Sequence, residues 1–110
     1  MDKDNKVFLG HIIDCIVNIE DYTKNFTAND FSNNRMIVDA VIRNLEIIGE
    51  AARNLADNFK SVNSHIPWRD IAGLRNILIH EYFGVDKEKV WKVIQKDLPS
   101  FKKEIELLLK

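Results

Sequence analysis

Residues 35–59, RMIVDAVIRNLEIIGEAARNLADNF, decide the fold of this chain. Apolar side chains recur there at intervals of three or four residues, which is the spacing of one face of an α-helix. This apolar row comprises Val38, Val41, Leu45, Ile48, Ala52, Leu55 and Phe59, and Ile42, Gly49 and Ala56 widen it. The row predicts one long helix from Arg35 to Phe59, and its breadth places that helix at the centre of a helical domain.

The same segment carries a second row, made of charged side chains whose sign mostly alternates. It comprises Arg35, Asp39, Arg43, Glu46, Glu50, Arg53 and Asp57. If this charged row faces solvent, it forms ion pairs that each contribute roughly a few tenths of a kcal/mol. Because the helix is expected to be central, the alternative is that the row lines a cleft or a contact between subunits.

The segments before this helix also follow a helical pattern. Apolar residues between Phe8 and Tyr22 predict a first helix. Residues 27–34 are rich in Asn, Ser and Asp, so we expect a loop that provides the cap of the next helix.

Three further helical segments are expected after residue 65. Pro67 suits the first position of a helix that continues to a stop near Gly84, because glycine favours helix termination. Asp86 is expected to cap a fourth helix, and Pro99 is expected to open a fifth. Together the segments predict an all-α fold, an antiparallel bundle of four to five helices.

Length and composition agree with this fold class. The 110 residues suffice for one domain, so residues 1–110 are expected to form a single domain. The chain has 4 Gly and 2 Pro, fewer than the many turns of a strand-rich fold require. No apolar run approaches the ~18 residues of a membrane span. The first residues, MDKDNK, lack a signal peptide's apolar region, and the single Cys15 fits a reducing compartment, so a cytoplasmic protein is expected.

The charge balance gives no overall attraction for nucleic acid. The chain has 16 basic and 17 acidic residues, a net charge of −1. If RNA binds, a few local cations must hold its phosphates. A basic face is one candidate, although such a face is more typical of a solvated surface. It consists of Lys87, Lys89, Lys92 and Lys96.

Other residue types carry simpler interpretations. Trp68 and Trp91 are expected to be core aromatic residues, with stacking on a base as the alternative. Cys15 lies in an apolar row and is expected to be unreactive. His11 and His65 have no partners at metal-ligand spacing, and there is no glycine-rich phosphate loop, so neither a metal nor a cofactor is expected.

The segment RNILIHEY, Arg75–Tyr82, gathers residues that suit RNA cleavage. Asn76 and His80 are one helical turn apart and share a face. Arg75 lies about 140° from His80, so its side chain must wrap around the helix, or a second copy must complete the site. A histidine moves protons near neutral pH, and an arginine stabilises a charged phosphorane. From chemistry alone, a surface ion pair beside a helix-end histidine is the better explanation of the segment, since an Arg and a His on one helix occur by chance in many domains.

The segment also resembles a known family. Arg75–Tyr82 matches the Arg-x4-His-x-Tyr motif of HepT-like toxins in the HEPN superfamily. Two flanking stretches are similar to the same family, RNLEIIGEAA at Arg43–Ala52 and PWRDIAGLRNILIHEYFGVD at Pro67–Asp86. The resemblance implies a HEPN-like helical bundle that forms a homodimer and brings two motif copies into one RNA-binding cleft.

The resemblance also implies an activity and a partner. Arg75 and His80 would be the catalytic pair of a metal-independent endoribonuclease, with Asn76 in support. The chain would be the toxin of a type II toxin–antitoxin system. A minimal nucleotidyltransferase antitoxin of the MNT type would neutralise it by transferring AMP to Tyr82. The alternative is a non-catalytic helical binding subunit of a nucleotidyltransferase complex.

Overall fold

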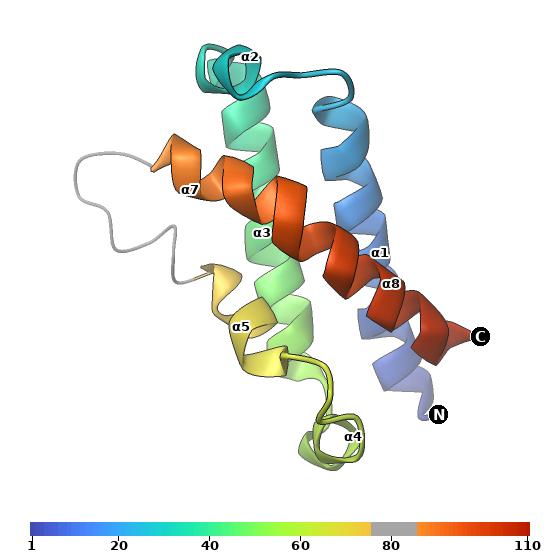
Figure 1. The fold of residues 1–110 in the computed structure, drawn as a ribbon. Helices are drawn as coiled ribbons and strands as arrows, with labels where there is room; N and C mark the ends of the chain where they lie inside the picture. The colour runs from blue at the N-terminus through green and yellow to red at the C-terminus, as the bar shows by residue number, and fades with distance from the viewer. Residues whose placement is uncertain (76–85) are drawn as a thin grey trace.

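The computed structural model describes residues 1–75 and 86–110, and every regular element in these ranges is a helix (Figure 1). The expected all-α fold is therefore confirmed. In chain order the elements are α1 (Lys3–Tyr22), α2 (Ala28–Ser32), α3 (Arg35–Asn54), α4 (Asp57–Val62), α5 (Trp68–Ala72), α7 (Lys87–Lys92), the π-helix η1 (Val93–Asp97) and α8 (Leu98–Leu109).

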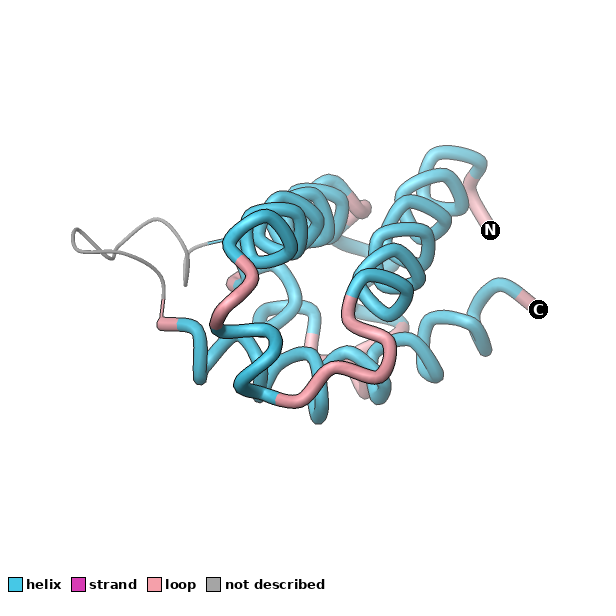
Figure 2. Tube along the Cα trace, turned by 90° about the horizontal axis from the view of Figure 1, so that it is seen from above, coloured by secondary structure: helices cyan, strands magenta, loops and turns pink. Residues whose placement is uncertain are grey.

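The two longest helices, α1 and α3, lie side by side and run in opposite directions (Figure 1). The view in Figure 2 shows α7, η1 and α8 crossing beneath this pair as a second layer. The core between the layers is made of branched aliphatic side chains with essentially no exposure. Its most buried members include Ile12, Ile16, Ile19, Val41, Leu45, Ile48, Leu98 and Ile105. The apolar row of residues 35–59 thus forms the centre of the fold, as predicted.

The prediction that the central helix reaches Phe59 is wrong, because α3 ends at Asn54. Leu55 and Ala56 are extended, with ψ of 143° and 140°. The side chain of Asn5 on α1 accepts a hydrogen bond from the Ala56 backbone N–H at 3.1 Å, which replaces the helical bond lost there. The chain then turns into the separate helix α4.

The expected loop at residues 27–34 contains the short helix α2. Thr27 and Asp30 form a capping box, in which each side chain accepts a hydrogen bond from the other's backbone N–H. Phe31 anchors α2 because its ring is fully buried. The predicted cap of the next helix is confirmed, since the side chain of Asn34 accepts from Ile37 N–H at 3.1 Å.

The predicted helix after Pro67 is interrupted. Pro67 precedes α5 instead of occupying its first position, and α5 ends in a turn at Gly73. Glycine is the weakest helix former after proline, by about 1 kcal/mol relative to alanine. Leu74 and Arg75 are helical again. The expected stop near Gly84 lies outside the described residues.

The predicted fourth and fifth helices form one continuous rod. The cap at Asp86 is confirmed, since its side chain accepts from Lys89 N–H at 3.1 Å. Pro99 lies at the second position of α8, as predicted, but the backbone is already helical before it, from α7 through η1. Proline lacks an N–H and crowds the carbonyl four residues earlier. The wider π turn of η1 lies directly before it and relieves that crowding.

In the ranges that the structure describes, no helix combines the length and the apolar character that crossing a membrane demands.

Candidate functional site

Arg75 is the one expected site residue that the structure describes. Asn76, His80 and Tyr82 lie outside the described residues, so the convergence of His80 with Arg75 stays a prediction. Arg75 follows the turn at Gly73, and its side chain is 38% exposed. Arg75 is thus anchored at the surface of the bundle, where its guanidinium reaches solvent.

The backbone at Arg75 packs directly against α3. A Cβ atom placed on Gly49 would lie 3.0 Å from the carbonyl oxygen of Ala72 and 3.0 Å from the backbone nitrogen of Arg75. Such a separation is shorter than ordinary van der Waals contact, so the two segments can approach this closely because residue 49 has no side chain. Trp68 and Ile71 of α5 are buried in the core and anchor the segment that leads to Arg75. The core therefore fixes the backbone from which the Arg75 side chain extends.

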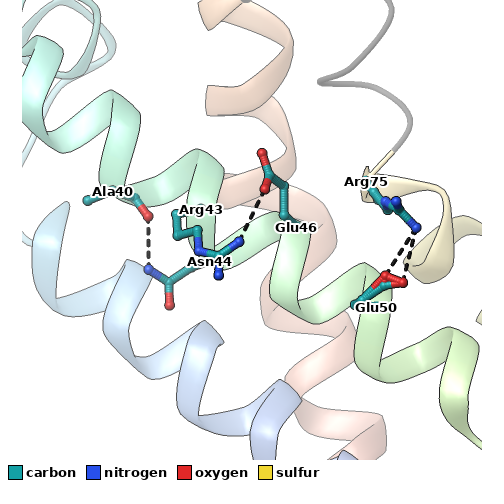
Figure 3. Close-up of polar contacts among 6 residues, drawn as sticks. All are labelled: Ala40, Arg43, Asn44, Glu46, Glu50 and Arg75. Atoms are coloured by element: carbon teal, nitrogen blue, oxygen red, sulfur yellow. Dashed lines mark hydrogen bonds and ion pairs between the residues drawn. The ribbon is translucent and has the colours of Figure 1, made fainter.

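The Arg75 side chain forms an ion pair with Glu50 of α3 (Figure 3). Its Nη1 donates to both carboxylate oxygens, at 3.0 Å to Oε1 and 3.1 Å to Oε2. The described residues provide no hydrogen-bond partner for Nε or Nη2. Because both side chains are well exposed, the pair contributes less than about 1 kcal/mol to stability.

The charged row of α3 lines a hollow beside this pair. The hollow has a volume of about 320 Å³ and is lined by Arg43, Glu46, Ile47, Glu50 and Arg75. Within it, Arg43 Nη1 lies 3.5 Å from Glu46 Oε2 (Figure 3). Both interpretations of the charged row have support here, because these side chains are exposed and ion-paired and also line the hollow.

The charges in the hollow balance one another. Two guanidinium groups face two carboxylates, so a phosphate entering the hollow must compete with carboxylates for its cations. Outside the hollow, the predicted basic face on α7 and η1 is exposed to solvent, which is compatible with both of its interpretations. Its members are Lys87, Lys89, Lys92 and Lys96.

A larger hollow of about 700 Å³ lies between α5 and the η1–α8 segment. Its charged residues are Arg69, Asp70 and Asp97. Two carboxylates against one guanidinium repel a phosphate, so this hollow is the poorer site for RNA. In the described ranges, no group of three or more His, Cys, Asp and Glu residues is placed to hold a metal ion.

The aromatic and cysteine predictions are largely confirmed. Trp68 is buried, and its indole Nε1 donates to the carbonyl of Asn63 at 3.0 Å. Trp91 is half-buried and packs on Phe31 with ring centroids 5.4 Å apart. Cys15 is buried, and burial raises the pKa of its thiol, which keeps it protonated and unreactive.

Glu50 is the residue that sequence reasoning did not assign to the site. It was expected only as one member of the charged row. Two signals in the sequence point to it: Glu50 follows Gly49, a mid-helix glycine that requires a packing reason, and both lie in the RNLEIIGEAA stretch. The pairing itself depends on α3 and residues 72–75 meeting in space.

Comparisons with known proteins agree with the resemblance of the motif. The profile of the family described as "Ribonuclease HepT-like" matches residues 12–108. The chain is 50% identical over 105 residues to "Gamma-glutamylcyclotransferase and putative RNase MJ0434" of Methanocaldococcus jannaschii, an alignment that covers 96% of this chain and 47% of that protein. The chain therefore spans about half of that relative.

Two other relatives align over nearly their whole length. "Putative RNase MJ1380" of the same organism is 45% identical over 106 residues, covering 96% of this chain and 97% of that protein. "Probable ribonuclease HepT" of Thermococcus cleftensis is 43% identical over 110 residues, covering 100% of both chains. No solved structure matches the chain significantly. With this profile match and these relatives, the chain belongs to the HepT-like ribonuclease family.

Proposed function

We propose that this protein is a metal-independent endoribonuclease in which Arg75 and His80 are the catalytic pair. The observation that carries the proposal is the family match over residues 12–108, which includes the whole RNILIHEY segment. The position of Arg75 supports it, because its guanidinium is exposed beside a hollow while its backbone is fixed against α3.

The proposed reaction uses the nucleophile that RNA itself supplies. His80 accepts the proton of the ribose 2′-OH, and the 2′ oxygen forms a bond to the adjacent phosphorus. Arg75 stabilises the negative charge of the phosphorane. The bond from phosphorus to the 5′ oxygen then breaks, and that oxygen takes a proton from an imidazolium. The products are a 2′,3′-cyclic phosphate and a 5′-hydroxyl group, so the step requires no metal-bound water.

A homodimer is part of the proposal. Two copies related by a twofold axis would bring two motifs into one cleft, where Arg75 of one copy and His80 of the other would act on the same phosphate. The spacing of five residues supports this arrangement, because on a helix it would set Arg75 and His80 about 140° apart, and a partner copy could supply the group directed away.

The proposed regulation acts on the same segment. The protein would be the toxin of a type II toxin–antitoxin system, and its partner would be an MNT-type nucleotidyltransferase. The phenolic oxygen of Tyr82 would attack the α-phosphorus of ATP, release pyrophosphate and retain AMP. A bulky anionic group so close to His80 would block the cleft and repel RNA phosphates.

The modification can be tested separately from cleavage. The protein is incubated with the nucleotidyltransferase and ATP, and its intact mass is measured. We expect added AMP in the wild type and none in Tyr82→Phe. A gain in mass that persists in Tyr82→Phe would show that another residue is modified.

The cleavage assay tests the function itself. The purified protein is mixed with RNA in excess EDTA, and products are examined for 2′,3′-cyclic phosphate ends. We expect cleavage by the wild type, a loss of about 10²–10⁴-fold in His80→Ala, and about 10²–10³-fold in Arg75→Ala. Circular dichroism verifies that both variants remain folded.

Two results would contradict the proposal. Undiminished cleavage by His80→Ala would remove the assigned mechanism. A wild-type protein that binds a nucleotidyltransferase stably but never cleaves RNA would instead be a non-catalytic helical subunit of that complex.

A further inference from the structure

We infer that Glu50 is a positioning residue for Arg75, a role that rests on the proposed ribonuclease function. In this role Glu50 holds one end of the guanidinium and leaves the Nε–Nη2 edge for an RNA phosphate. The inference is carried by the contact between the two side chains and by the packing of their backbones.

The geometry of the ion pair uses a single nitrogen of Arg75. Nη1 donates to both oxygens of Glu50, at 3.0 and 3.1 Å (Figure 3). The described residues place no partner on Nε or Nη2. These two groups form the pair of parallel donors that matches two oxygens of a phosphate. The carboxylate therefore restrains the guanidinium without occupying its phosphate-binding edge.

The packing beneath the pair makes this restraint precise. Glu50 and Arg75 lie 25 residues apart in sequence, and their backbones meet at Gly49, where α3 approaches Arg75 as closely as the missing Cβ allows. Two side chains that extend from backbones in contact need little further ordering to form their ion pair. By comparison, Arg43 and Glu46 pair within one helix and at the longer distance of 3.5 Å.

A positioning role and simple charge neutralisation predict different kinetics. If Glu50 positions the guanidinium, its loss misplaces Arg75 in the transition state and lowers kcat. If Glu50 only neutralises Arg75, its loss frees a cation for the RNA phosphates and lowers KM.

The experiment compares Glu50→Ala and Glu50→Gln in steady-state RNA cleavage by the full-length protein. We expect Glu50→Ala to lower kcat by about 10- to 100-fold while KM changes by less than about threefold. Glu50→Gln keeps one oxygen that accepts from Nη1, so it should retain roughly a third or more of the wild-type kcat. An unchanged kcat in Glu50→Ala, with or without a fall in KM, would overturn the inference.

Glu46→Gln and Glu20→Ala are the matched controls. Glu46→Gln removes the same charge from the same hollow but contacts Arg43 instead of Arg75. If Glu46→Gln lowers kcat by the 10- to 100-fold expected of Glu50→Ala, the effect comes from the charge of the hollow and the positioning role is wrong. Glu20→Ala removes an exposed ion pair with Lys102 of α8 and shows what loss of such a pair does to the folded protein.

A measurement independent of activity separates this inference from the proposed function. Nitrogen-15 NMR detects the signals of arginine guanidinium groups. The signals that disappear in Arg75→Lys are those of Arg75. We expect slow rotation and distinct Nη signals in the wild type, and fast averaging in Glu50→Ala. If the wild type cleaves no RNA but shows this difference, the proposed function fails and the restraint stands. If rotation is equally fast in both proteins, the restraint is absent, whatever the activity.

Discussion

Arg75 and Glu50 show what a sequence does and does not reveal about individual residues. Arg75 was identifiable because it belongs to a short motif with a chemical rationale. Glu50 was not, since its partner lies 25 residues away and is brought to it by the packing at Gly49. Periodicity places a side chain on a face of its own helix, and it does not specify which distant segment meets that face.

The buried thiol of Cys15 yields a prediction for a single residue. Burial, and to a lesser extent Asp14, raises the pKa of the thiol, so the folded protein holds less thiolate than an unfolded chain at the same pH. We expect DTNB at pH 8 to label the native protein far more slowly than the denatured protein. Because the chain has one cysteine, the absorbance change reports Cys15 directly. Equal labelling rates would show that the side chain is accessible.

The same shift has a consequence for stability. The raised pKa means that the folded state keeps its proton at pH values where the unfolded state has lost it. The free energy of unfolding should therefore decrease as the pH rises above the unfolded thiol pKa of about 8.5. Cys15→Ala should lack this component of the pH dependence in urea unfolding measured between pH 7 and 10. An identical pH dependence in both proteins would contradict the assignment.

At the level of elements, helix boundaries set by nearby residues were predicted correctly. A boundary set by a contact with a distant segment was not. The caps at Asn34 and Asp86 followed from residue type and were confirmed. The end of α3 was missed because the hydrogen bond that stabilises it comes from Asn5, 51 residues away. Pro99 lies in the first turn of α8 as predicted, but α8 continues directly from η1, since a π turn accommodates a proline that an ordinary helix would not.

The contact between α3 and residues 72–75 can be tested with Gly49→Ala. Alanine favours a helix by about 1 kcal/mol over glycine, but here its Cβ would meet backbone atoms at 3.0 Å. We expect a net destabilisation of about 1–3 kcal/mol in urea unfolding, together with a lower kcat because the backbone of Arg75 must shift.

Gly10 of α1 provides the matched control for this substitution. It is also a helical glycine, but a Cβ placed there would have no heavy atom within 4 Å. Gly10→Ala should therefore stabilise the protein by up to about 1 kcal/mol. If both substitutions change the free energy of unfolding in the same direction, the close approach at Gly49 does not determine the effect of Gly49→Ala.

At the scale of the whole molecule, the fold class followed from the apolar row of α3 and the scarcity of turn residues. The arrangement of the helices in two layers could not be predicted, because the spacing of apolar residues does not specify the direction in which one helix crosses another. The proposed site requires two copies of the chain, since Arg75 of one copy and His80 of the other are expected to act together across a twofold axis.

Complementation between two inactive variants tests that assembly. If each site combines Arg75 of one copy with His80 of the other, a dimer of Arg75→Ala with His80→Ala contains one intact site. In an equal mixture half of the dimers are mixed, so about a quarter of the wild-type activity should return. A mixture as inactive as its components would show that each copy builds its own site. Light scattering should give twice the chain mass of 12.8 kDa for every sample.

The π turn at Val93–Asp97 has a consequence for how members of this family vary in length. A π turn holds more residues than the α turn it replaces. Deletion of one residue there should return the turn to α geometry, so it should not propagate as a rotation of about 100° along α8. A chain shortened by one residue between 93 and 97 should therefore keep Leu98, Phe101 and Ile105 buried, with little loss of stability.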